Sequence, residues 1–203
     1  MSRWTFLVFA GLLLASGPVS AQYIGIFMDP GASSCGASDV GPNPRIDLHV
    51  MAILGGSFTE FTGAQFTILG APESWTPQNV LWVPDDKVVI NIGHPMFPNP
   101  SHPYDPGVNV AFGACQESSA SVRVSLGRIV LLGPPTGDHV RLRVSWFKLG
   151  SADPRCPFIT NCERGYPKVC VEGGEIILNG PPTSSCPTAV EASTWTTVKR
   201  LYG

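Results

Sequence analysis

The segment 93–107 (GHPMFPNPSHPYDPG) contains three side chains of types that bind metal ions. His94, His102 and Asp105 follow the spacing His-x7-His-x2-Asp, and five prolines in fifteen residues would stiffen the backbone between them. Imidazole and carboxylate ligands together suit zinc or copper. The simpler interpretation is that these are exposed residues of a long, stiff loop, because a segment so rich in proline cannot form a central strand.

Two aromatic residues are candidates for a binding platform. Trp75 lies between two prolines in the segment 72–77, and Tyr104 lies in the proline-rich segment. An exposed aromatic ring can stack against the apolar face of a sugar ring. The alternative for Trp75 is structural, covering the end of the fold. Trp146 continues the apolar face of residues 140–144 and is expected in the core.

The sequence carries no familiar catalytic motif. It has no Gly-x-Ser-x-Gly elbow, no phosphate-binding glycine loop and no His-Glu-x-x-His. Asp29, Asp39, Asp85 and Asp86 could contribute to a structural calcium site, although they form no Asp-x-Asp-x-Asp-Gly ladder. We therefore expect a protein that is not an enzyme and has no cofactor other than a possible structural calcium.

The charge balance argues against nucleic acid as a partner. Thirteen Lys and Arg residues face fifteen Asp and Glu residues, a formal charge of −2. Binding to a polyanion driven by net charge needs the opposite balance. The main basic grouping is Arg123, Arg128, Arg141 and Arg143, which we expect on the outward face of neighbouring strands, either solvated or contacting an acidic polymer.

The first 21 residues have the pattern of a secretory signal peptide. Arg3 precedes an apolar run over 4–15, the breaker Gly17-Pro18 follows, and small residues lead to Ala21. No other segment reaches 18 apolar residues, so we expect no transmembrane segment after its removal. The expected location is secreted, periplasmic or on the cell surface.

All six cysteines lie beyond the predicted signal peptide: Cys35, Cys115, Cys156, Cys162, Cys170 and Cys186. An even number in an oxidising compartment predicts disulfides, and six cysteines allow fifteen pairings. Four of them fall in the Cys-rich part 156–186, which we expect to be stapled locally. Cys35 and Cys115 then remain as a candidate long-range pair.

The dominant period of the mature chain is two. In Arg45–Leu54 and Val140–Leu149 apolar residues alternate with polar ones, as in half-buried strands. Gly173-Gly174 has the composition of a two-residue hairpin turn. Further predicted strands are Tyr23–Met28, Ala64–Leu69, Val80–Val83, Val88–Ile92, Val108–Phe112, Val122–Leu132, Lys168–Val171 and Glu175–Leu178.

These strands, punctuated by Gly-Pro turns and without intervening helices, predict an all-β fold over residues 22–189. The expected form is an antiparallel β-sandwich of about nine or ten strands, with a closed barrel as the alternative. The tail 190–203 is different, because Trp195, Val198, Leu201 and Tyr202 fall on one face of a helix. We expect a short amphipathic C-terminal helix that docks on the sandwich or acts as an export or attachment signal.

The segment Leu54–Phe66, a strand followed by Gly-Gly and then Phe-Thr-Gly-Ala-Gln-Phe, resembles the early strands of cohesin-like and immunoglobulin-like sandwiches. The wider layout resembles uncharacterised exported proteins of uncultivated bacteria. In these, a strand-rich domain is followed by a Cys-rich stretch like Cys156–Cys170, with Val-Cys-Val-Glu-Gly-Gly, and by a tail like Val190–Tyr202. The resemblance implies the fold and export, and it carries over no functional residue.

The function expected from these features is a non-catalytic interaction or structural module at the bacterial cell surface or exterior. Its partner would be a protein or a polysaccharide, recognised by loops displayed on a rigid scaffold. A carbohydrate-binding module is the alternative, and a secreted hydrolase is the third possibility.

Overall fold

The computed structural model describes residues 22–37, 40, 45–55, 60–99, 102–117, 123–133, 139–147 and 155–180, without the side chains of 99 and 102–105. These residues form thirteen strands and no helix, so the all-β prediction is confirmed for them. Within the same ranges, no helix is long and apolar enough to cross a membrane. The predicted signal peptide and C-terminal tail lie outside the described residues.

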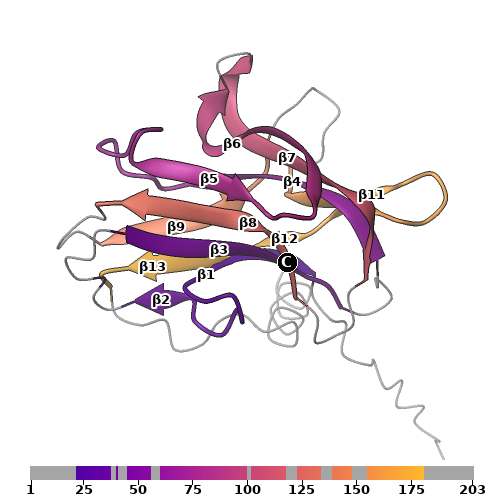
Figure 1. The fold of residues 1–203 in the computed structure, drawn as a ribbon, viewed down its shortest axis with the longest axis horizontal. Helices are drawn as coiled ribbons and strands as arrows, with labels where there is room; N and C mark the ends of the chain where they lie inside the picture. Colours follow the sequence, from indigo (N-terminus) through magenta and orange to yellow (C-terminus); the bar gives the residue numbers. More distant parts are fainter. Residues whose placement is uncertain are drawn as a thin grey trace, which may run out of the picture.

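The strands form two layers, which Figure 1 shows stacked on each other. The first layer is a five-stranded sheet in the order β12-β1-β3-β8-β5. Its strands are β1 (Tyr23–Phe27), β3 (Arg45–Ile53), β5 (Val80–Pro84), β8 (Arg123–Leu132) and β12 (Glu172–Gly173).

The second layer is an eight-stranded sheet with the path β11-β10-β4-β9-β13-β2, to which β7 and β6 are added beside β4. All pairs are antiparallel except β1 with β12 and β13 with β2. The sandwich is therefore mixed rather than purely antiparallel. Its strands are β2 (Gly36–Ala37), β4 (Glu60–Leu69), β6 (Val88–Asn99), β7 (His102–Glu117), β9 (Val140–Ser145), β10 (Phe158–Asn161), β11 (Lys168–Cys170) and β13 (Glu175–Leu178).

The core lies between the layers and is filled by the alternating apolar residues of both. Leu48 and Leu126 of the first sheet and Phe66 and Leu142 of the second are fully buried. The predicted inward faces of residues 45–52 and 140–144 are confirmed by this burial.

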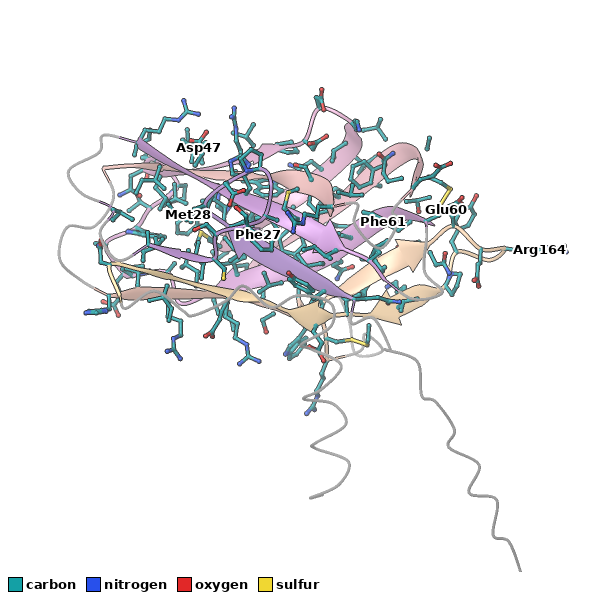
Figure 2. The ribbon with its side chains drawn as sticks, turned by 90° about the horizontal axis from the view of Figure 1, so that it is seen from below. Phe27, Met28, Asp47, Glu60, Phe61 and Arg164 are labelled. Carbon is teal, nitrogen blue, oxygen red and sulfur yellow. A yellow bond between two sulfur atoms is a disulfide. The ribbon has the colours of Figure 1, made fainter. Side chains whose placement is uncertain are left out.

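The outer face of β3 differs from the prediction. The alternation predicts Met51 on the polar side of the strand, yet Met51 and Ile53 are both buried. They form a second apolar cluster with Phe27, Ala32 and Cys35, because the chain after β1 folds back over this face of the sheet. In Figure 2, Phe27 and Met28 are labelled near the start of this loop.

The glycine pair does not form a hairpin turn. Gly173 belongs to β12, which pairs with β1, whereas the next strand β13 pairs with β9 of the other sheet. Neither glycine has positive φ, so the conformational reason for the predicted turn is absent. Glycine is needed instead for close approach, because a Cβ at Gly173 would collide with the carbonyl oxygen of Val144.

The disulfides also correct the prediction. Cys115 bonds to Cys162 and Cys156 bonds to Cys170, so the predicted Cys35–Cys115 pair is wrong. Cys35 is disulfide-bonded to a partner outside the described residues. The local staple is confirmed for Cys156–Cys170. Cys115 instead reaches Cys162 because β7 and β10 both pair with β4 at Phe61.

Replacing Gly173 by alanine should destabilise the fold by about 3 kcal/mol, because the added methyl group must displace the backbone of β9. Gly165→Ala is the matched control, since its positive φ costs about 1–2 kcal/mol but its Cβ would enter open space. Urea unfolding of both variants measures the two free energies. Equal losses for the two variants would contradict the proposed collision.

Candidate functional site

The tryptophan predicted as an exposed platform is buried. Trp75 is 7% exposed and belongs to the main core cluster. Its amide donates a hydrogen bond to the carbonyl of Pro72 at 2.9 Å, and the amide of Thr76 donates to the side chain of Asn79 at 2.6 Å. These turns direct the indole inward, so the expectation of an exposed platform is wrong and the structural alternative holds.

The proline-rich segment is a β-hairpin rather than a loop. Residues 93–99 form the end of β6 and residues 102–107 the start of β7, with His94 opposite Gly107 and Asn99 opposite His102. Prolines are tolerated because β6 is an edge strand, and this part of β7 pairs only with β6 within the described residues.

The hairpin register places the predicted metal ligands at different positions. His102 is opposite Asn99 near the tip, whereas His94 is opposite Gly107, five residues further along β7. The side chains of His102, Tyr104 and Asp105 lie outside the described part, so the metal site and the Tyr104 platform stay predictions.

His94 is a partly buried residue whose ring contacts its own strand. Its Nδ1 accepts a hydrogen bond from the amide of Met96 at 3.1 Å, and its ring lies 4.8 Å from that of Phe97. Burial lowers the pKa of His94 below 6.5. An interaction with the backbone of Val80 raises this pKa, but by less than burial lowers it. The Nε2 atom of His94 is buried and makes no hydrogen bond of good geometry in the described part of the chain.

Other potential metal ligands have partners already. One group of three converging ligand atoms occurs among the described residues, Glu60 with Cys115 and Cys162, but the two sulfurs are bonded to each other. The Asp29 carboxylate, a predicted calcium ligand, accepts hydrogen bonds from the amides of Ser33 and Ser34. Burial would raise the pKa of Asp29, but these amide bonds together outweigh it and hold the pKa below 3.8.

A first hollow of about 470 Å³ lies on the outer face of the five-stranded sheet, between His49, Asp85, Ser125 and Arg128. Arg128 contributes a positive charge to this hollow, but that charge is already compensated, because the guanidinium lies 3.2 Å from the Asp47 carboxylate. Asp47 also bonds Arg45 at 2.7 Å, and this bond above all lowers the pKa of Asp47. The described arginine that lines this hollow is therefore already paired with a carboxylate.

A second hollow of about 500 Å³ lies where the two sheets meet beside β9. Three separate segments line it: Arg143, Val144, Ser145 and Trp146; then Arg155, Cys156 and Pro157; then Val171, Glu172 and Gly173. The predicted grouping of four arginines is wrong, because Arg123 and Arg128 belong to one sheet while Arg141 and Arg143 belong to the other. The structure instead brings Arg143 to Arg155.

Trp146 lines this second hollow and is only half-buried, so the prediction that it is a core residue is wrong. Strand β9 ends at Ser145, and the alternation that placed Trp146 inside ends with it. Sequence reasoning missed the hollow because its three lining segments are far apart along the chain. No protein-family model matches the chain, and neither does any curated protein.

Replacing His94 by asparagine should remove part of the acid sensitivity of the fold. A histidine whose pKa is lowered in the folded state takes up its proton more readily when unfolded, so stability falls as the pH drops below 6.5. Asparagine keeps an oxygen that can accept from the Met96 amide two residues on. The free energy of unfolding, measured from pH 7.5 to 5, should therefore fall less in His94→Asn than in the unchanged protein.

Other titrating groups do not obscure this difference. Burial also lowers the pKa of His49, but that contribution is present in both proteins and cancels. The shifts of Asp29 and Asp47 act below pH 3.8. Parallel curves for the two proteins would show that His94 titrates normally.

Proposed function

We propose that this protein is a secreted, non-catalytic interaction or structural module that associates through the outer edge of β6. The observation that carries this proposal is a run of exposed apolar side chains. Val89, Ile90 and Ile92 are 66%, 51% and 52% exposed. Figure 1 shows the hairpin of β6 and β7 at the margin of the sandwich, beyond β5.

The edge of β6 lacks the protection that soluble sheets usually have. Exposed edges normally carry charges or prolines that discourage pairing with another chain. β6 has no charged residue between Val88 and Asn99, and its prolines, Pro95 and Pro98, follow the apolar part. Among the described strands, β6 pairs only with β7. Residues 90–94 therefore offer backbone groups and apolar side chains together.

The occupant that fits this edge best is a second copy of the same chain. The sequence Ile90-Asn91-Ile92 is symmetric about Asn91, so antiparallel pairing about that residue places Ile90 of each copy opposite Ile92 of the other. Such cross-strand apolar pairs stabilise a sheet, and the arrangement is a closed two-fold dimer.

Charge does not oppose this pairing. In the same register Lys87 lies opposite Pro95, so no like charges meet across the strands. The bulge at Val89 interrupts the ladder and keeps the paired segment short. We therefore expect a small interface and weak, concentration-dependent association.

Ile90→Lys combined with Ile92→Lys should strongly weaken this association, because each cross-strand pair then places two positive charges opposite each other. Sedimentation velocity over a concentration series measures the dimer, and the dissociation constant should rise at least about tenfold. Leu132→Lys is the matched control, since Leu132 is also exposed, at 40%, but lies on β8. The control should associate like the unchanged protein.

Hydrogen exchange separates strand pairing from looser contact. Amides of residues 90–92 should gain protection as the protein concentration rises, while those of exposed turns should not. A protein that stays monomeric at high concentration, or a lysine variant that associates unchanged, would refute the proposed dimer. Self-association would also be refuted if β6 were found to pair with a different protein instead of with a second copy of the chain.

A further inference from the structure

We propose that the hollow lined by Arg143, Trp146 and Arg155 binds an acidic sugar, a pyranose ring that carries a carboxylate. The site uses residues remote in sequence from β6 and does not depend on self-association. Its volume of about 500 Å³ lies within the usual range for small-ligand sites, roughly 300–1,000 Å³.

The charge of the hollow favours an anion. Arg143 and Arg155 make no ion pair with any described acidic residue, in contrast to Arg45 and Arg128, which share Asp47. Glu172 is the one carboxylate among the described lining residues, so two arginines against one glutamate give these residues a net charge of +1. Planar guanidinium groups bind carboxylates with two parallel hydrogen bonds.

The indole of Trp146 favours a sugar over a free anion. A simple anion would use the two guanidinium groups alone and leave the half-buried indole without a role. The apolar face of a pyranose ring stacks on an aromatic surface, while its hydroxyl groups bond to polar groups around it. Ser145 and Glu172 also line the hollow, and their side chains carry polar groups of this kind.

The walls of the hollow are held before any ligand arrives. The Cys156–Cys170 disulfide fixes the segment that follows Arg155 to the end of β11. The amide of Val171 donates to the carbonyl of Pro157, and the amide of Val144 donates to the carbonyl of Gly174, each at 2.9 Å. A site built in advance loses less entropy when it binds.

Isothermal titration with tri-galacturonic acid tests the proposal, with the neutral trisaccharide of galactose as the comparison ligand. The acidic sugar should bind, and the neutral one should bind at least about tenfold more weakly, because it cannot make charged hydrogen bonds to the guanidinium groups. Arg143→Gln and Arg155→Gln should each weaken the acidic sugar about tenfold or more and lower the salt dependence of binding.

Arg141→Gln is the matched control, because Arg141 is exposed on the same strand but does not line the hollow. It should bind like the unchanged protein. Trp146→Ala should lose most of the affinity, whereas Trp146→Phe, which keeps an aromatic face, should retain much of it. Melting temperatures of all variants separate lost binding from lost folding, and the arginine variants are expected to melt normally because both side chains are exposed.

Three results would overturn the proposal. One is the absence of binding by tri-galacturonic acid to the folded protein. Another is equal affinity for the acidic and neutral sugars. The third is binding of inorganic sulfate or of a poly-glutamate peptide as tight as that of the sugar and unchanged in Trp146→Ala, which would show a general anion site.

Discussion

The two layers depend on the close approach of Gly174 to a strand of each sheet. Its amide donates to the carbonyl of Ile24 in β1 at 2.8 Å, and its carbonyl accepts from the amide of Val144 in β9 at 2.9 Å. The neighbouring Gly173 lies directly against the Val144 carbonyl, where a side chain would collide. Backbone hydrogen bonds thus join the sheets at this point, and the apolar faces between them remain close enough to pack densely.

Long strands were predictable because one face of each is buried. Alternation over residues 45–52 and 140–144 identified both the strand and the inward side chains. β2 and β12 have only two residues each and therefore carry too little pattern to be recognised, whereas β11 and β13, with three and four residues, were predicted. The prolines of 93–107 led to the wrong prediction of a loop. A hairpin at the margin of a sheet tolerates prolines, because not every backbone amide has to donate to a neighbouring strand.

The candidate site was less predictable than the fold, because contacts between distant segments create it. The position of Trp75 follows from a turn that directs its ring into the core, whereas that of Trp146 follows from the end of β9 at Ser145. Arg143 and Arg155 become neighbours only when the crossing at Gly173 brings three segments together. The sequence shows that these residues are arginines and a tryptophan, but that they lie side by side becomes clear only from the order of the strands in the two sheets.

The two layers of the sandwich differ in which of their outward-facing groups are paired or covered. On the five-stranded side, Asp47 compensates two arginines and a folded-back loop covers Met51. The other layer leaves Arg143 unpaired and Ile90 uncovered in the described structure.

Both disulfides with known partners belong to that second layer, at β7, β10 and β11. β10 and β11 have only four and three residues, and although β10 is buried, β11 is largely exposed, so apolar burial alone holds β11 weakly. Covalent bonds supply the missing rigidity: Cys115–Cys162 joins β7 to the residue after β10, and Cys156–Cys170 joins the approach to β10 with β11. The part of this layer that borders the hollow with Arg143 and Arg155 is therefore held by cross-links in addition to core packing.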